Sequence, residues 1–452
     1  MVYLPHWPVS NKSAIVRDNG FDSIRKILDN LNNPHRKLPP VIHIAGTNGK
    51  GSTVAFLAAI FQSAGYKTHI YTSPHLHHCN ERIVIANHQI DDNYLYQILE
   101  EVRIAADGID LSLFEALTLA AILAFSQKPA DICIIETGMG GRIDSTNVID
   151  NKILTIITAI SYDHTKYLGD NIAAIAAEKA HIMRNRVPAV IAHQTRPAGA
   201  TIEIRSLEID NPLIHYGANF EIDINADDSF NFHYQGKTIN TDFKKLPPPA
   251  LPGQHQYLNA ANAIAGIIAI KDFQTANFYI NRKHVAEGLK KVKWPSRLQR
   301  INGNINKIFK NPESEIWIDG AHNSGGAYVL ANWFKEKKRE DLNKKINKSC
   351  YLITGFTKGK AEKQFFDQFK NIVNMICPVR VQGEPNPESA EIIKEEIIKS
   401  GIDATEQEDL TEALYFLANL NKNTPCRIVI CGSLYLARDL KSAEQFFNYK
   451  YC

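Results

Sequence analysis

The segment Gly46–Thr53, with the sequence GTNGKGST, contains residue types that bind phosphate. Its glycines allow backbone N–H groups to converge on an anion, and a helix that follows would add partial positive charge at its N-terminus. Lys50 supplies a mobile cation. The apolar run Val41–Ala45 directly before it is typical of a buried strand. The segment therefore predicts a nucleotide-phosphate site formed by Thr47, Asn48, Gly49, Lys50, Gly51, Ser52 and Thr53.

This segment differs from the usual P-loop at two points. Ile44 stands where the first glycine would be, and Gly51 separates Lys50 from Ser52. The general ATPase motif is thus matched only in part. A glycine-rich turn without a ligand is the alternative, and the lysine and the hydroxyl side chains disfavour it.

A second chemical signal is the stretch Glu136–Asn147, with the sequence ETGMGGRIDSTN. Glu136 ends an apolar run, and small residues after it leave space beside the carboxylate. A buried carboxylate without a partner is costly, so it requires a cation. Mg²⁺ bound to nucleotide phosphates is the expected one. A salt bridge to Arg142 is the alternative.

The elements that must position these residues follow an alternating pattern. Short β-branched runs alternate with amphipathic helical segments from residue 41 to about residue 192, which predicts βαβ units on a parallel sheet. Ligands of such sheets bind at the carboxyl ends of the strands, so the loops after residues 45, 71, 136 and 160 should form the site. Strands are expected at 41–45, 68–71, 131–136, 153–160 and 188–192, and helices at 53–64, 93–106, 113–125 and 172–183.

The rest of the chain predicts a second, smaller α/β region. A small antiparallel insertion is expected at about 201–245, and a helix at 258–270. Beyond it, strands are expected at 315–318, 349–354, 375–381 and 427–431, and helices at 326–337, 361–372, 387–399 and 411–420. The expected division is an N-terminal domain 1–295, a linker 296–300 and a C-terminal domain 301–452.

Composition excludes several classes of protein. A net charge of +3 over 452 residues is too small to indicate nucleic-acid binding, although it suits anionic small substrates. The cysteines are odd in number and form no C-x-x-C pair, so a reduced cytoplasm is expected. Pro5 and Pro8 interrupt what would be a signal peptide, and the longest apolar stretch, 116–125, is shorter than the roughly 20 residues that span a bilayer. We expect a soluble protein without a membrane partner.

Three local patterns have plain explanations. His75, His77, His78 and Cys79 crowd one loop without the spacing of a zinc site, so structural zinc is disfavoured. Ser112 and Glu115 have the spacing of a capping box at a helix start. The lysine-rich segment 335–348 is expected to be a solvated helix face.

The GTNGKGST segment resembles the signature of the Mur ligase superfamily and, within it, of the folylpolyglutamate synthase and dihydrofolate synthase family. The resemblance extends from Val41 to Leu436. Three departures are visible: Ser296 replaces the glycine of a PGRxQ motif, Ser324 replaces the proline of DGAHNP, and the segment 354–360 lacks the aspartates of GxxxDKD. Further similar motifs are TSPHL at 72–76, ETGxGGRxDxTN at 136–147, DHxxxLG at 163–169, GxHQxxNAA at 253–261 and GSLYL at 432–436.

The resemblance implies the α/β fold class, with an N-terminal P-loop ATPase domain on a mostly parallel sheet and a smaller Rossmann-like C-terminal domain. It also implies ATP and two Mg²⁺ sites, with ligands from Ser52, Ser73, Glu136, His164 and Lys179. Taken by itself, Lys179 is an ordinary helical lysine that should face water. By resemblance it is carbamylated and becomes an anionic ligand.

Further roles implied by the resemblance concern both substrates. Asn259 would lie near the adenine, Arg297 would bind phosphate, and Asp319 would bind the ribose. Lys50, Lys179 and His322 would be catalytic, with His322 on the glutamate side. The segments that would border the pterin consist of Ser112, Leu113, Phe114 and Glu115, and of Ile143, Asp144 and Ser145, although capping alone is an alternative for Ser112 and Glu115.

The implied activity is ATP-dependent ligation of L-glutamate to 7,8-dihydropteroate, to the glutamate tail of tetrahydrofolate, or to both, and we expect both. The two domains would close about a hinge at 295–299, and a cytoplasmic monomer is expected. Folylpolyglutamate synthesis alone is one alternative. A peptidoglycan Mur ligase is another, which the 40 residues before Val41 disfavour because they are too few for a further substrate domain. The third is a nucleotide switch that hydrolyses ATP without ligation.

Overall fold

The computed structural model of the protein describes residues 21–382, 384 and 386–451. The segment 1–12, which we do not expect to be a signal peptide, lies outside these residues. The chain divides into two compact units, each with its own sheet. The first unit extends to Ala250 and includes Gln256–Lys293; the second comprises Leu251–His255 and the chain from Trp294 onward. Among the described residues, no helix has the length and apolar character needed to cross a membrane.

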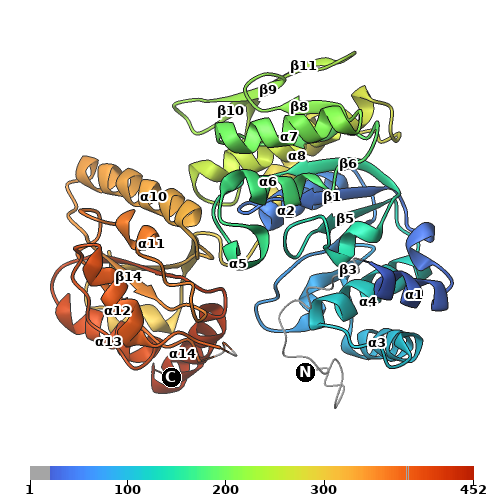
Figure 1. Ribbon diagram of the computed structural model, residues 1–452. Helices are drawn as coiled ribbons and strands as arrows, with labels where there is room; N and C mark the ends of the chain where they lie inside the picture. Colours follow the sequence, from blue (N-terminus) through green and yellow to red (C-terminus); the bar gives the residue numbers. More distant parts are fainter. Residues whose placement is uncertain (1–20, 383, 385, 452) are drawn as a thin grey trace. The chain divides into compact units, whose positions relative to one another are not determined.

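The first unit is built on an eight-stranded sheet with the order β4-β3-β2-β5-β1-β6-β7-β8 (Figure 1). Neighbouring strands in the series β2-β5-β1-β6-β7-β8 are parallel. Strand β3 pairs antiparallel with β2, and β4 pairs antiparallel with β3. The expected mostly parallel sheet is therefore confirmed. Its strands are β1 Val41–Ala45, β2 Thr68–Tyr71, β3 Ile83–Ile85, β4 His88–Gln89, β5 Ile132–Glu136, β6 Lys152–Ile157, β7 Ala189–Ile191 and β8 Leu213–His215.

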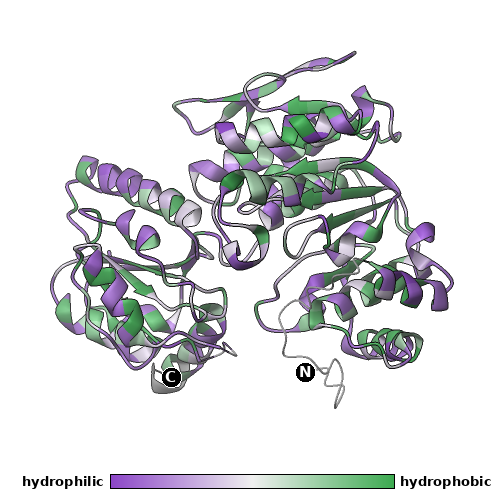
Figure 2. Ribbon diagram, in the orientation of Figure 1, coloured by the Kyte–Doolittle hydropathy of each residue, from purple (hydrophilic) through white to green (hydrophobic). Residues whose placement is uncertain are grey.

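Helices cover both faces of this sheet, and the central strands are buried along their length and largely hydrophobic (Figure 2). Val41, Cys133 and Ile135 share a core with α1, α3 and α4. On the opposite face, Gly266 of α8 lies against Leu154. The helices are α1 Asp22–Asn30, α2 Lys50–Ser63, α3 Asp92–Ala106, α4 Leu113–Gln127, α5 Thr165–Leu168, α6 Ile172–Ala180, α7 Arg196–Glu208, α8 Gln254–Asp272 and α9 Arg282–Lys291.

The structure corrects the expected insertion at 201–245. Residues 201–208 belong to helix α7, because the buried residues Ala198, Ile202 and Ser206 recur every four positions. Strand β8 then joins the main sheet. Only the later part forms a separate antiparallel sheet, which consists of β9 Phe220–Ile224, β10 Phe230–Gln235 and β11 Asn240–Leu246.

The second unit has a five-stranded sheet with the order β12-β13-β16-β14-β15. Gln299 and Arg300, expected in the linker, belong to β12, which pairs antiparallel with β13. The other strands are parallel. The elements are β12 Gln299–Ile301, β13 Glu315–Ile318, β14 Ser349–Thr354, β15 Met375–Pro378, β16 Cys426–Cys431, α10 Ser324–Asn343, α11 Lys363–Asp367, α12 Ala390–Lys399, α13 Leu410–Leu420 and α14 Leu436–Tyr451.

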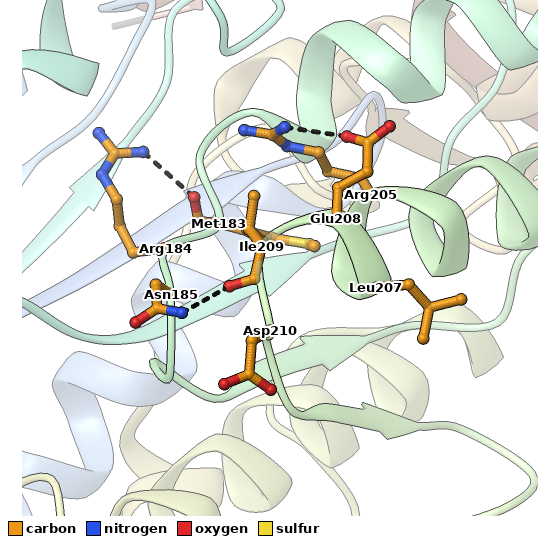
Figure 3. Close-up of a pocket in the computed structure, with 8 residues that line it drawn as sticks. All are labelled: Met183, Arg184, Asn185, Arg205, Leu207, Glu208, Ile209 and Asp210. Atoms are coloured by element: carbon orange, nitrogen blue, oxygen red, sulfur yellow. Dashed lines mark hydrogen bonds and ion pairs between the residues drawn. The ribbon is translucent and has the colours of Figure 1, made fainter.

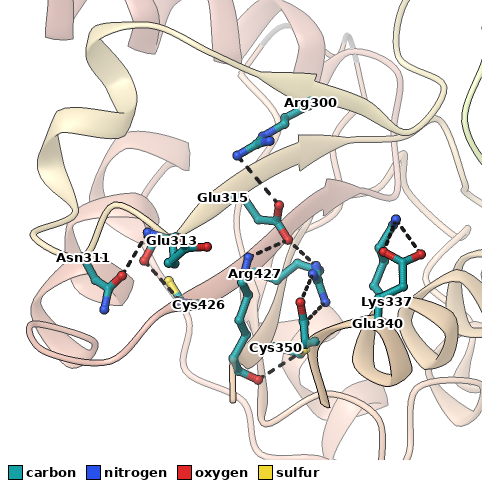
Figure 4. A network of polar contacts seen from close by, with 12 residues as sticks. Arg300, Asn311, Glu313, Glu315, Lys337, Glu340, Cys350, Cys426 and Arg427 are labelled. Carbon is teal, nitrogen blue, oxygen red and sulfur yellow. Dashed lines mark hydrogen bonds and ion pairs between the residues drawn. The ribbon is translucent and has the colours of Figure 1, made fainter. Parts of the chain in front are cut away.

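A buried ionic network lies beneath α10 (Figure 4). Arg427, which is 2% exposed, bonds to Glu315 and reaches Asp341 at 2.9 Å. The Nζ atom of Lys348 lies 3.4 Å from the Glu315 carboxylate, and its side chain is buried. The expectation that all of 335–348 is a solvated face is therefore wrong at Lys348, because this lysine neutralises a buried carboxylate.

Candidate active site

Four predicted loops meet at the carboxyl ends of the central strands of the first sheet. Ser73 follows β2, Glu136 ends β5, the P-loop follows β1, and His164 follows β6. The four strands are neighbours and run parallel, so their carboxyl ends lie side by side. Residues far apart in the sequence are brought to one place by this strand order.

Two glycines of the P-loop are required by close contacts. A Cβ atom on Gly46, whose φ is +148°, would stand 1.9 Å from Oγ1 of Thr158. A Cβ atom on Gly49, whose φ is +91°, would stand 2.4 Å from Oδ1 of Asn259. Asn259, on α8, thus lies against the P-loop.

The loop is braced against the segment that follows β6. The backbone N–H groups of Thr47 and Asn48 donate to the carbonyl oxygen of Ala159 at 3.0 and 3.1 Å. Nδ2 of Asn48 donates to Oγ of Ser161 at 3.0 Å. Because helix α2 begins at Lys50, the N–H groups of Lys50, Gly51 and Ser52 belong to its first turn, where helix geometry provides no partner. Sequence reasoning missed Ser161 as a site residue, although it directly follows the strand end expected at residue 160.

Lys50 occupies the centre of this site. Its Nζ donates to the carbonyl oxygens of Gly46 and Thr47 at 3.2 and 3.3 Å and lies 3.9 Å from the Glu136 carboxylate. Glu136 is 3% exposed and also accepts from the backbone N–H of Ser73 at 3.4 Å. Arg142 instead pairs with Glu178 at 2.8 Å, so the alternative salt bridge from Arg142 to Glu136 is wrong.

Lys179 is buried, which corrects the expectation that it faces water. Its exposed fraction is 4%, and its Nζ donates to the carbonyl oxygen of Gly46 at 2.9 Å. Burial, and then the nearby charge of Lys50, lower the pKa of Lys179 to about 7. The cause is the packing of α6, which directs the face containing Ile175 and Lys179 inward. Burial thus favours the neutral amine of Lys179 more than it is favoured in an exposed lysine.

His164 caps the short helix α5 in a left-handed conformation, with φ +51°. Strand β6 ends at Ile157 rather than at the expected residue 160, so His164 stands on a loop beyond the sheet edge. Its Nε2 lies 3.7 Å from a carboxylate oxygen of Asp163. A partly exposed imidazole beside a carboxylate is suited to metal ligation.

The chemistry of the donor set fits a divalent cation bound with a nucleotide. Ser52 is 1% exposed, and its hydroxyl, the Glu136 carboxylate and the His164 imidazole are donor types that such cations accept. The buried hydroxyl oxygens of Thr53 and Thr137 have no hydrogen-bond partner among the described residues. Thr53 belongs to helix α2, which follows the P-loop, and Thr137 follows Glu136. A ligand bound at this site would supply the missing partners.

The two predicted acceptor segments lie together. The Ser112–Glu115 capping box is confirmed by reciprocal bonds of 3.3 and 2.8 Å. The ring of Phe114 lies so close to Gly138 that a Cβ atom there would be 2.5 Å from it. Leu113 and Ile143 are 41% and 40% exposed, so both present apolar surface to solvent.

In the second unit, the predicted residues gather after β13. The Asp319 carboxylate accepts from the backbone N–H groups of Leu298 and Ala321, each at 2.8 Å. Nη1 of Arg297 donates to the carbonyl oxygen of Ser296 at 2.9 Å, and Nδ1 of His322 lies 2.9 Å from that of Gly320. Asp319 therefore fixes the segment that contains Arg297.

A cavity of about 550 Å³ lies at the opposite ends of the strands of the first sheet, beside β7 and β8 (Figure 3). Arg184 and Asn185 precede β7, while Arg205 and Glu208 precede β8, so the cavity adjoins the amino ends of these strands. Figure 3 shows its polar groups bonded to one another. It is distinct from the place where the predicted residues meet.

A P-loop, a buried carboxylate and a buried lysine on a parallel sheet, followed by a second α/β unit, define a Mur-type ligase. Residues 44–267 match the Mur ligase middle domain, and residues 302–443 match the dihydrofolate synthetase C-terminal domain. The chain belongs to the dihydrofolate synthase and folylpolyglutamate synthase family, whose members are ATP-dependent ligases.

Relatives and solved structures agree along the length of the chain. A dihydrofolate synthetase of Saccharomyces cerevisiae is 31% identical over 93% of this chain and 96% of its own length. A dihydrofolate synthase/folylpolyglutamate synthase of Bacillus subtilis is 29% identical over 93% and 94%. E. coli FolC in complex with DHPP and ADP has a TM-score of 0.80 at 25% identity, covering 94% of this chain and 93% of that one. A bifunctional synthase with Mn, AMPPNP and L-glutamate bound, at 24% identity, covers 94% of both chains with a TM-score of 0.79 and has the same fold.

Proposed function

We propose that this protein uses ATP to join L-glutamate to dihydropteroate and to the glutamate tail of tetrahydrofolate. The observation that supports it best is the pair Lys50 and Lys179, which both donate to the Gly46 carbonyl oxygen, together with the Glu136 carboxylate 3.9 Å from Lys50. Family membership supports the choice of glutamate and pterin acids over other substrates.

The reaction is uphill in water, so the acceptor carboxylate must first be activated. In the proposed sequence, a carboxylate oxygen attacks the γ-phosphorus of ATP, its bond to ADP breaks, and an acyl phosphate forms. The amine of glutamate then attacks the acyl carbon, loses a proton and expels phosphate. Lys50 and the N–H groups at the start of α2 would hold the β- and γ-phosphates and neutralise the charge that develops during transfer.

ATP and a divalent cation suit the first unit. A related synthase binds Mn with AMPPNP, and the donor types here match such an ion. We propose two Mg²⁺ sites, with ligands from Ser52, Ser73, Glu136, His164 and a carbamylated Lys179. A bound Mg²⁺ would neutralise phosphate charge and polarise the phosphoryl group. The low pKa and burial of Lys179 support carbamylation, because only a neutral amine adds to CO₂.

The remaining assignments follow the sequence motifs. We propose that Asn259, Arg297 and Asp319 bind the adenine, phosphate and ribose of ATP, and that His322 serves the glutamate step. The segments Ser112–Glu115 and Ile143–Ser145 would hold the pterin. The exposed apolar side chains of Leu113 and Ile143 support this, because a pterin ring needs flat apolar contacts.

The test is a set of parallel reactions with ATP and L-glutamate, containing dihydropteroate, tetrahydrofolate or neither. Mass spectrometry should show dihydrofolate in the first and glutamate-extended tetrahydrofolate in the second. Product only with tetrahydrofolate would restrict the protein to folylpolyglutamate synthesis. ADP release at one rate, whether or not glutamate and a pterin acid are present, would overturn the ligase function in favour of a nucleotide switch.

A further inference from the structure

A series of buried hydrogen bonds connects the strand before the P-loop to the loop Gly138–Ser145, which we call the acceptor loop because it contains proposed contacts to the acceptor substrate. His43, in the middle of β1, is 1% exposed, and its Nε2 lies 2.9 Å from Oγ1 of Thr146. Oγ1 of Thr146 donates to Oδ1 of Asp144 at 2.5 Å. None of these contacts serves the main hydrogen-bond ladder of the sheet.

The bonds made by Asp144 determine which group donates in each hydrogen bond of this series. Asp144 accepts from the backbone N–H groups of Thr146 and Met139, at 3.0 and 2.9 Å, in addition to the Thr146 hydroxyl. Since the hydroxyl proton of Thr146 is directed to Asp144, its oxygen must accept from Nε2–H of His43. Nδ1 of His43 has no hydrogen-bond partner. The imidazole is therefore neutral, with its proton on Nε2.

The neighbours of His43 reinforce this state. Burial, followed by the charges of Lys152 and Arg184, holds the pKa of His43 well below its usual range. Lys152 and Arg184 both donate to Oδ1 of Asn147, the residue after Thr146, at 2.6 and 3.0 Å. The residues that directly follow the acceptor loop, Thr146 and Asn147, are thus held by side chains from β1, from β6 and from the segment after α6.

A second contact ties the same loop to the start of α4. Oγ of Ser145 donates to Oγ1 of Thr118 at 3.1 Å, and Oγ1 of Thr118 donates to the carbonyl oxygen of Phe114 at 2.8 Å. The side-chain oxygen atoms of Asp144 and Ser145 therefore form hydrogen bonds with other groups of the protein. Between the two anchors, Ile143 projects to the surface with 40% exposure.

We propose that His43 and Thr146 are positioning residues that fix the acceptor loop relative to the P-loop strand and thereby set the affinity for the pterin acid. This inference rests on the proposed function. Both side chains are buried. They act through Asp144, whose two oxygens hold the glycine-rich turn at Met139 and the short helix Ser145–Val148 in one arrangement.

Two matched pairs of variants test the proposal. Thr146→Ser retains the hydroxyl, whereas Thr146→Val has nearly the same shape but neither donates nor accepts. His43→Gln retains a donor at a similar reach, and His43→Leu does not. We expect Thr146→Val and His43→Leu to raise KM for dihydropteroate about tenfold, with ATP affinity by calorimetry unchanged, because one buried bond is lost and its partner left unsatisfied. Thr146→Ser and His43→Gln should stay within about twofold of wild type.

Coupling provides the second readout. The double variant His43→Leu/Thr146→Val should bind the pterin acid no worse than either single variant, because both substitutions interrupt the same series of hydrogen bonds. Equal shifts in acceptor KM and ATP affinity, additive effects, or lower kcat alone with KM unchanged would make the residues merely structural. If the valine variant does not fold, the pair at His43 decides the question by the same criteria. Absence of ligation by wild type would instead overturn the proposed function.

Discussion

Lys50 and Lys179 donate to the same acceptor, the carbonyl oxygen of Gly46, at 3.2 and 2.9 Å. Two ammonium groups this close repel each other, and the charge of Lys50 contributes to the low pKa of Lys179. A polyphosphate beside them relieves the repulsion. Carbamylation of Lys179, as proposed above, would likewise remove the repulsion, because it replaces one of the two positive charges with a negative one.

Replacement of Lys50 should separate catalysis from folding. Lys50→Ala is expected to lower kcat by about 10²- to 10³-fold, as for removal of one donor that stabilises transition-state charge. The melting temperature should hardly change, because the ammonium makes only carbonyl contacts and one long ion pair. Lys67→Ala, at an exposed position beyond the other end of α2, is the control and should retain full activity. Loss of cooperative melting in Lys50→Ala would show a structural role.

A methyl group at Gly49 should block the nucleotide site. Gly49→Ala places Cβ 2.4 Å from Oδ1 of Asn259, so we expect ATP affinity, measured by calorimetry, to fall by at least about tenfold. Gly65→Ala is the matched control, since Gly65 has a similar φ of +88° but open space around it. It should cost about 1 kcal/mol of stability and leave ATP affinity unchanged. Equal affinities in both variants would contradict the proposed contact.

Carbamylation of Lys179 predicts a dependence on CO₂. The neutral amine adds to CO₂, an N–C bond forms and one proton is released. Activity should therefore fall several-fold in decarbonated buffer and return when bicarbonate is added. Lys179→Gln should have low activity that bicarbonate does not change. A wild-type enzyme with the same rate in both buffers would rule out a labile carbamate.

The neutral state of His43 predicts a loss of stability in acid. The pKa of His43 is lowered in the folded protein, so as pH falls through about 6.5 the unfolded chain takes up a proton that the folded protein does not. The free energy of unfolding should decrease by up to about 1.4 kcal/mol per pH unit from this residue. Above about pH 7.5 it contributes no slope. Urea unfolding at pH 7.5 and 5.5 should show a smaller difference for His43→Gln than for wild type.

The buried network of the second unit predicts a large effect from one substitution. Arg427→Met leaves Glu315 and Asp341 short of a buried partner, and should cost about 3–5 kcal/mol in urea unfolding. Arg300→Met removes an exposed charge 4.0 Å from Glu315 and should cost less than about 1 kcal/mol. Similar costs for both would show that burial does not strengthen the network.

The sheet framework was predictable because local signals and tertiary structure agree there. Strands β1, β2, β13 and β14 have the expected bounds, since each is a short run rich in β-branched and aromatic residues. Agreement failed where two periodicities compete. Ile202 and Ile204 alternate as in a strand, yet α7 buries Ile202 and leaves Ile204 59% exposed. Only the four-residue spacing from Ala198 indicates the helix.

The site was predictable as a set of loops, but not in its contacts. Motifs and strand ends indicate which loops contribute, and parallel neighbours bring them together. Burial of Lys179 and pairing of Arg142 with Glu178 depend on how α6 packs, which no local pattern records. The buried position of His43 was equally hidden, because a histidine in an apolar run gives no sign of its partner.

The strand order also affects biosynthesis. The P-loop leaves the ribosome early, whereas β5, β6 and the helix with Lys179 are translated later, and β5 inserts between β2 and β1. A nascent chain that ends before α6 contains Lys50 and Glu136 but not Lys179. The joint contact of Lys50 and Lys179 with the Gly46 carbonyl oxygen can therefore form only after residue 179 has been translated, so shorter truncated chains lack the lysine pair.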